Sequence, residues 1–142
     1  MWPRDNGTQV VVAATCNLGV SKAQNWTFSG ASGGLNTIKD GYGLCLDARD
    51  NSTHNPGDEG DPVQVWSCNG GAQQQWDVEV AKDLSGEQYI VLYNNASPTN
   101  GPEVLDARND ATHSAGANND PVQLWSYNET DNQLWGVSSP IS

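Results

Sequence analysis

Two carboxylates and two indoles recur at the same spacing in this chain. Asp47 precedes Trp66 by 19 residues, and Asp106 precedes Trp125 by the same interval. A carboxylate accepts hydrogen bonds, and an indole offers a flat apolar face. Together they suit a ligand that carries hydroxyl groups on one side and C–H bonds on another. The spacing therefore indicates two copies of one binding site.

The aspartates also have a simpler structural interpretation. Each is followed two residues later by an arginine, Arg49 or Arg108, against which it would cap a turn. That role does not require a tryptophan at a fixed distance in both copies. For the Asp and Trp taken together we favour the binding role.

Other chemistry is poorly supported. Residues 30–34 match the Gly-x-Ser-x-Gly pattern, but a nucleophile elbow needs a helix after it, and residues 35–41 show no helical pattern. No two of the 17 acidic residues stand out as a pair for glycoside hydrolysis. We therefore expect no catalytic residues and no enzymatic activity.

Metal and cofactor sites are not expected either. His54 and His113 each follow their aspartate by seven residues, and each would either contact a ligand or brace its loop. Neither has a second His or Cys at ligand spacing. The acidic stretch 58–61 lacks the alternating pattern and distal Glu of an EF-hand loop, so we expect a solvated loop there.

An internal repeat organises these residues. Residues 45–68 and 104–127 are identical at 13 of 24 positions without a gap, at an offset of 59. Each copy is followed by a Gln-x-Trp triplet, at residues 74–76 and 133–135, and a third triplet lies at residues 24–26. We expect the triplet tryptophans, Trp26, Trp76 and Trp135, to lie in the core. The triplet glutamines, Gln24, Gln74 and Gln133, would either satisfy backbone groups at a turn or contact ligand.

The elements between these landmarks are short strands. Apolar segments separated by Gly-, Asn-, Asp- and Pro-rich loops predict an all-β chain with about four strands per repeat, closed into a barrel. The predicted strands are 10–15, 25–28, 35–39, 44–48, 63–67, 76–80, 88–93, 104–107, 122–126 and 134–137.

The order Cys-Leu-Asp, then Gln-x-Trp-x-Cys, then Gln-x-Trp resembles the ricin B-chain lectin family, which is also classed as family 13 carbohydrate-binding modules. The resemblance implies a β-trefoil of three pseudo-repeats in one domain, residues 1–142. Repeat one would cover residues 1–29, in part, repeat two 35–80 and repeat three 87–138.

The same resemblance implies the site residues. The aspartate would accept from two adjacent sugar hydroxyls, the tryptophan would stack on the sugar, and the amides would add contacts. These residues are Asp47, Gln64, Trp66, Gln73 and Gln74 in repeat two, and Asp106, Gln123, Trp125, Asn132 and Gln133 in repeat three. The family usually has Asn at the position of Gln73. The implied ligands are glycans that end in galactose or N-acetylgalactosamine.

The first repeat is incomplete in this alignment. Matching Cys16 to Cys68 places residues 11–16 opposite 63–68. Ala14 then stands in place of the stacking tryptophan, Trp66 or Trp125, which we call the aromatic plate. No Cys-Leu-Asp segment precedes it, so we expect no working site in repeat one. A longer chain or a companion chain would then supply the first two strands of the repeat.

The cysteines follow the same pattern. The resemblance pairs Cys45 with Cys68 in a disulfide and leaves Cys16 without a partner. In repeat three, Val104 and Tyr127 replace both cysteines together.

Charge and composition restrict the partners. The net charge of −11 disfavours nucleic acid and anionic membrane surfaces, and no apolar run approaches a membrane span. The first residues carry no stretch of signal-peptide type. Five Asn-x-Ser/Thr sequons and a cysteine pair nevertheless favour a secreted, extracellular protein.

Two functions fit these observations. The first is non-catalytic carbohydrate binding, either as a free lectin or as a module cropped from a secreted glycosidase. The alternative is a β-trefoil that acts as a protein-interaction or inhibitor domain through its loops. The paired Asp and Trp favour the first, since an inhibitor loop would not need them twice.

Overall fold

The computed structural model describes residues 6–13, 21–30, 33–84, 87–97, 102–115 and 117–137. These residues form an all-β fold with three single-turn 3-10 helices, and no described helix has the length and apolar character needed to span a bilayer. The strands are β1 (Val11–Val12), β2 (Thr27–Phe28), β3 (Leu35–Asn36), β4 (Ile38–Lys39), β5 (Cys45–Ala48), β6 (Val63–Trp66), β7 (Trp76–Leu84), β8 (Glu87–Asn94), β9 (Glu103–Ala107), β10 (Asp120–Ser126) and β11 (Trp135–Val137). The 3-10 helices are η1 (Lys22–Gln24), η2 (Ala72–Gln74) and η3 (Asp131–Gln133).

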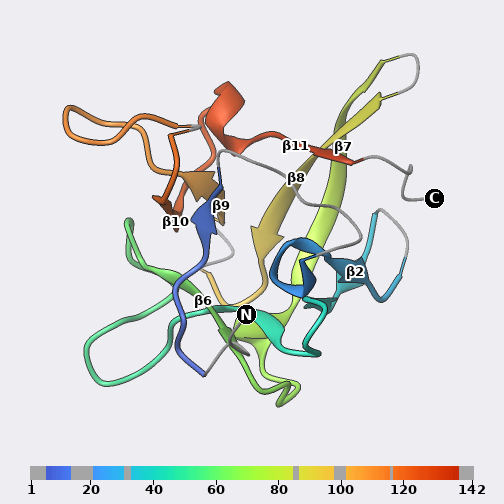
Figure 1. Cartoon of the computed structure of the whole chain (residues 1–142), viewed down its shortest axis with the longest axis vertical. Coiled ribbons are helices and arrows are strands. Elements are labelled where there is room, and N and C mark those ends of the chain that lie inside the picture. The colour runs from blue at the N-terminus through green and yellow to red at the C-terminus, as the bar shows by residue number, and fades with distance from the viewer. Residues whose placement is uncertain are drawn as a thin grey trace.

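The strands follow a trefoil order (Figure 1). In repeat three, β8 pairs with β9, β9 with β10, and β11 returns to β8. Repeat two is built in the same way from β4, β5 and β6, and β3 pairs with β7. The described part of repeat one contributes β1 and β2, which correspond to the third and fourth strands of the other repeats. The long β7–β8 hairpin joins repeats two and three.

One predicted strand is divided in the structure. Residues 35–39 were expected to form a single strand, but β3 pairs with β7 while β4 pairs with β2 and β5. The segment changes partners at Thr37 because it must serve both sheets. Among the other predicted strands, β7 is extended most and continues past a bulge between Val80 and Lys82 to Leu84, whereas β2 is shorter than expected and begins only at Thr27.

Short segments of the three repeats pair around a pseudo-threefold axis. The bridging pairs are Gln9 with Gln64, Pro62 with Gln123, and Val11 with Pro121. In repeat-two numbering, each pair joins position 62 of one repeat to position 64 of the next, but only when residues 9–12 correspond to 62–65 at an offset of 53. The predicted alignment, which placed Val11 opposite Val63, is therefore wrong by one residue here. Ala13, rather than Ala14, comes opposite Trp66, while Ala14 and Cys16 lie outside the described residues.

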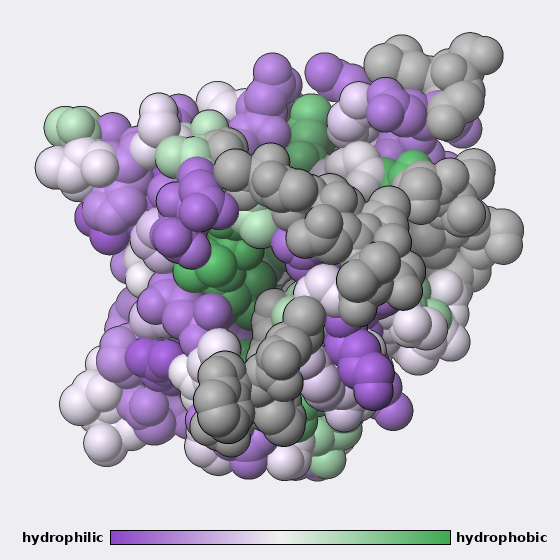
Figure 2. Space-filling model, in the orientation of Figure 1, coloured by the Kyte–Doolittle hydropathy of each residue, from purple (hydrophilic) through white to green (hydrophobic). Residues whose placement is uncertain are grey.

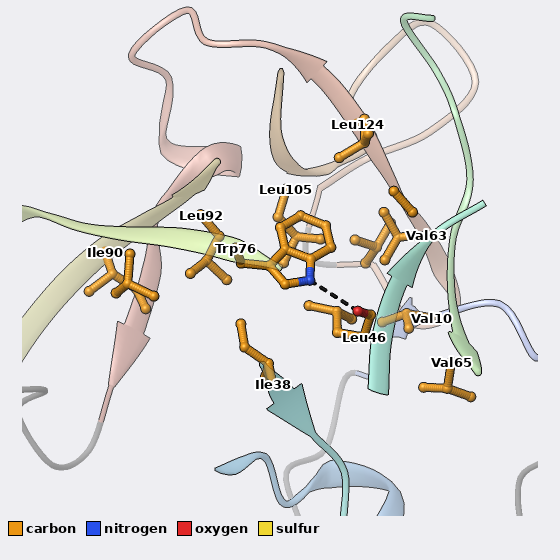
Figure 3. Close-up of a cluster of buried hydrophobic side chains, with 13 residues drawn as sticks. Val10, Ile38, Leu46, Val63, Val65, Trp76, Ile90, Leu92, Leu105 and Leu124 are labelled. Atoms are coloured by element: carbon orange, nitrogen blue, oxygen red, sulfur yellow. Dashed lines mark hydrogen bonds between the residues drawn. The ribbon is translucent and has the colours of Figure 1, made fainter. Parts of the chain in front are cut away.

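The core lies around the fully buried Trp76. Its indole Nε1 donates to the Leu46 carbonyl oxygen (3.0 Å), and aliphatic side chains from all three repeats surround the ring (Figure 3). Trp135 makes the equivalent bond to Leu105 (3.1 Å) and is partly buried, as is Trp26. The predicted core role of the three triplet tryptophans is confirmed. On the face shown in Figure 2, hydrophilic residues predominate and hydrophobic residues form a few separate patches.

Candidate functional site

The two predicted aspartates occupy matching places in the sheets. Asp47 on β5 lies opposite Gln64 on β6, and Asp106 on β9 lies opposite Gln123 on β10. The opposing glutamine Nε2 donates to Oδ1 of its aspartate at 3.0 Å in repeat two and 3.1 Å in repeat three. The strand register thus fixes the first bond to each carboxylate.

The triplet glutamines hold the other carboxylate oxygen. Gln74 Nε2 donates to Asp47 Oδ2 (2.8 Å) and to the Ser67 carbonyl (3.0 Å), while its Oε1 accepts from the Asn69 amide (2.9 Å). Both amide hydrogens are therefore used, and the side chain is 1% exposed. Gln133 makes the same three bonds, to Asp106, Ser126 and Asn128. The geometry supports the structural alternative: these glutamines position the aspartates and have no N–H left for a ligand.

The third amide differs between the repeats. Asn132 Nδ2 donates to Asp106 Oδ2 (3.1 Å) and to the Ala107 carbonyl (3.0 Å). In repeat two the longer Gln73 takes its place, and a hydrogen bond from its side chain helps to lower the pKa of Asp47. Both residues are partly exposed, so each can also face a ligand.

Burial decides the electrostatics of both aspartates. Asp47 and Asp106 are each 2% exposed. Desolvation raises the pKa of both carboxyls above the ordinary value, and the amide hydrogen bonds oppose that rise. The carboxylates therefore lie just beneath the surface, oriented by amides on both oxygens. The arginines do not cap them, because Arg49 bonds to Gln64 and Gly7, and Arg108 bonds to Asp110.

The two tryptophans remain at the surface. Trp66 is 39% exposed and Trp125 is 37% exposed, whereas Trp76 is fully buried. This contrast agrees with the predicted division into plates and core residues. Each plate thus presents an aromatic face beside a buried, oriented carboxylate.

A segment that borders each plate was not predicted from the sequence. Residues 6–8 border Trp66, and residues 59–61 border Trp125. Gly7 (φ 88°) and Gly60 (φ 85°) correspond, and their amides donate to Val65 and Leu124. A side chain there would be strained, and three residues that share only a glycine were too short a signal to find.

The first residue of each bordering segment differs in charge. Asn6 Oδ1 accepts from the Ser67 amide (2.8 Å) in repeat two. The Glu59 carboxylate accepts from the Ser126 amide (3.1 Å) and hydroxyl in repeat three. Repeat three therefore has a carboxylate at the rim of its plate where repeat two has an amide.

The acidic stretch 58–61 is only partly the solvated loop that was expected. Residues 58–60 are exposed, but Asp61 is 4% exposed and neither of its carboxylate oxygens has a hydrogen-bond partner. Burial raises the pKa of Asp61 to about 7. Asp61 is buried because its backbone continues into the central pairing: the Asp61 carbonyl accepts from the Leu124 amide (2.9 Å).

The histidines brace their loops. His113 Nδ1 lies 3.2 Å from Asp110 Oδ1 and 2.9 Å from the Thr112 hydroxyl. His54 is held in the same way by Asn51 and Thr53. Within the described residues, no three His, Cys, Asp or Glu side chains are grouped to hold a metal ion. In the Gly-x-Ser-x-Gly match, Ala31 and Ser32 lie outside the described residues, and β3 rather than a helix follows it.

The repeats also differ in one residue pair, at positions 45 and 68 in repeat two and 104 and 127 in repeat three, which we call the staple. Cys45 and Cys68 form the disulfide that the resemblance implied. In repeat three, Val104 is fully buried, and the Tyr127 ring packs edge-on against Tyr93 with ring centroids 5.7 Å apart.

Comparisons with known proteins agree with this architecture. Residues 22–118 match the model of a family described as ricin-type beta-trefoil lectin domain-like. No curated protein sequence matches the chain.

Three solved structures share the fold. The designed threefold-symmetric protein ThreeFoil is 24% identical, with a TM-score of 0.72 over 92% of this chain and 81% of its own. The exo-β-1,3-galactanase 1,3Gal43A from Clostridium thermocellum is 23% identical, with a TM-score of 0.62 over 84% of this chain and 23% of its own. A mosquitocidal holotoxin is 20% identical, with a TM-score of 0.60 over 90% of this chain and 15% of its own. The chain thus spans only a small part of the last two proteins.

Proposed function

The chain belongs to the ricin-type β-trefoil lectin-like family, and from that premise we propose that it binds galactose-type glycans, without catalysis, through repeats two and three. Domains of this kind are carbohydrate-binding modules and are typically non-catalytic. The ligands would end in galactose or N-acetylgalactosamine. The module would act either as a free lectin or as part of a larger secreted glycosidase.

One observation carries the proposal. In both repeats, a buried carboxylate is held by two glutamine amides beside a tryptophan that is more than one-third exposed. A pyranose presents adjacent hydroxyls and an apolar face, so it would donate to the carboxylate while it stacks on the indole. Neither half of this arrangement is needed for a trefoil core, which the other tryptophans supply.

The arrangement supports weak single sites and stronger multivalent binding. A monosaccharide has few heavy atoms to bind with, so each site alone should bind weakly. Two sites on one rigid body raise the apparent affinity for a surface that displays many copies of the sugar. Galactose is the preferred probe because the family resemblance implies it and one structural neighbour is a β-1,3-galactanase. The disulfide supports an oxidising, extracellular location.

A glycan array tests this function directly. The wild-type chain should bind glycans that end in galactose or N-acetylgalactosamine. Trp66→Ala and Trp125→Ala should each weaken binding, and the double variant should abolish it. Tyr42→Ala, which changes an aromatic residue of the β4–β5 turn, is the matched control and should bind as the wild type does.

A blank array from folded wild-type protein would overturn the proposal. Sugar-insensitive capture of a protein partner would then favour the protein-interaction alternative.

A further inference from the structure

The place of the disulfide in repeat two is taken by aromatic rings in repeat three. The offset of 59 relates Cys45 to Val104 and Cys68 to Tyr127. Val104 is fully buried, but Tyr127 is 36% exposed and its ring packs against Tyr93 at an interplanar angle of 72°. A side chain that only replaced a staple would gain most by being buried. The exposure of Tyr127 therefore asks for a second explanation.

The strand register places these rings on the face that holds the proposed site. Tyr93 on β8 lies opposite Val104 on β9, and Val104 lies opposite Trp125 on β10. Directly opposed residues in neighbouring strands project from the same face of a sheet. Asp106 follows Val104 by two positions on β9 and shares that face. The Cα atoms of Tyr93 and Trp125 are thus about 10 Å apart, which is two strand spacings, and buried Val104 lies between them.

Repeat two has no such extension. At the position opposite Cys45, where repeat three has Tyr93, β4 carries the exposed Lys39. The disulfide fills the place of Tyr127. The aromatic surface of repeat two is therefore confined to Trp66, whereas that of repeat three continues from Trp125 toward Tyr127 and Tyr93.

We propose that Tyr127 and Tyr93 form a second sugar subsite beside Trp125, so that repeat three binds an oligosaccharide of at least two residues and repeat two binds a single terminal sugar. This inference rests on the proposed function. A tyrosine suits such a subsite because its ring stacks on the C–H face of a pyranose and its hydroxyl bonds to the sugar oxygens. The separation of about 10 Å is longer than one pyranose ring.

The test uses Trp66→Ala as background, so that only repeat three can bind. Galactose and β-1,3-galactobiose are titrated by calorimetry against this variant. We expect galactobiose to bind roughly three- to tenfold more tightly than galactose, as one added aromatic contact predicts. A decisive second variant adds Val104→Cys and Tyr127→Cys, which transplants the repeat-two disulfide and keeps a staple at this place.

The transplanted disulfide should remove the preference for galactobiose and leave galactose affinity unchanged. Disulfide formation, checked by mass spectrometry, and a urea midpoint no lower than that of the parent variant would show that the fold is intact. Tyr127→Phe, which keeps the ring, should retain most of the preference, and Tyr42→Ala in the same background is the control for a distant aromatic residue.

The outcomes separate this inference from the function on which it rests. If neither sugar binds to folded protein, the proposed function is wrong and the subsite with it. If galactose and galactobiose bind equally well to Trp66→Ala, the function stands and the subsite is wrong. A galactobiose preference that survives the Val104→Cys/Tyr127→Cys exchange would also overturn it.

Discussion

Repeats two and three share the buried part of their sites and differ in the part that faces solvent. Beneath the surface, each aspartate is held by the same two glutamine amides at nearly the same distances. At the rim, Asn6 borders one plate and Glu59 the other, and Arg49 and Arg108 have different partners. The hydrogen bonds that orient the carboxylate are therefore the same in both repeats, and the residues around the exposed tryptophan are what differ between them.

Truncating a core tryptophan and a plate tryptophan tests the division between core and plate. Trp76→Ala should lower the free energy of unfolding by about 3–5 kcal/mol, because it removes a fully buried indole and its bond to Leu46. Trp66→Ala should have a much smaller effect on stability, since that ring is 39% exposed. Urea denaturation measures both. Equal losses in the two variants would mean that the plate is also a core residue.

The next prediction exchanges the staples. Cys45→Val combined with Cys68→Tyr gives repeat two the pair found in repeat three. The new tyrosine ring would have no aromatic neighbour, because Lys39 occupies the position that Tyr93 has in repeat three. We expect a loss of about 2–4 kcal/mol, the usual contribution of a native disulfide. Reducing agent should destabilise the wild type and leave this variant unchanged. A variant as stable as the oxidised wild type would show that the two staples are interchangeable.

The third prediction concerns pH. Burial raises the pKa of Asp61 and of Glu103 to about 7, and the corresponding residues around repeat two are the uncharged Thr8 and Leu44. Between about pH 4 and 7 the folded protein keeps protons that the unfolded chain has released. The free energy of unfolding should therefore fall as the pH rises through this window and level off above it.

The decrease should be at least about 2 kcal/mol, well below the total that about 1.4 kcal/mol per pKa unit would give for the two carboxyls, because the protein and solvent relax around the charges. Urea midpoints at pH 4.5 and 7.5 measure it. Asp61→Asn, which cannot ionise, should make the profile flatter, and Asp83→Asn, at an exposed position of β7 that does not perturb Asp61 or Glu103, is the control. Stability that rises between these two pH values would contradict the prediction.

The last prediction, for which we expect the smallest change, concerns the different partners of Arg49 and Arg108. Asp110 draws Arg108 into an exposed ion pair, whereas the corresponding Asn51 leaves Arg49 to bond to Gln64. Asp110→Asn should release Arg108 toward Gln123 and change galactose affinity at repeat three by about twofold, since exposed ion pairs contribute little. The arginine Nε–H signal in NMR spectra should shift on release. An unchanged signal would mean that the backbone, not Asp110, determines the position of the Arg108 side chain.

The sequence predicted what repeats and missed what does not. The Asp–Trp spacing located two pairs of a buried aspartate and an exposed tryptophan, and the Gln-x-Trp triplets located the core tryptophans, because identical residues at identical intervals fold alike. The alignment of repeat one was anchored on Cys16 and slipped by one residue, because Val10, Val11 and Val12 are identical and could not reveal the error. The pairing of Gln9 with Gln64 and of Val11 with Pro121 sets the register.

The different roles of Arg49 and Arg108 were also beyond the sequence. The two arginines occupy the same repeat position, and each is followed by an aspartate in its loop. Asp50 directly follows Arg49, whereas Asp110 lies two residues after Arg108, one place later in the repeat. Which acid lies within reach of a guanidinium depends on the folded loop, so the pattern of letters alone could not show it.

The backbone bonds at the centre of the trefoil have a consequence for biosynthesis. The Val10 amide donates to Val63, and the Val122 amide donates to Val10, so the centre joins residues more than a hundred positions apart. A ribosome releases the N-terminal end first, so Val10 must wait until Val122 has emerged before the centre can close. Contacts between such distant residues make folding slow. The newly made chain therefore has to avoid association through its synthesis, and the excess of acidic residues, which gives the whole chain a net charge of −11, favours this through mutual repulsion.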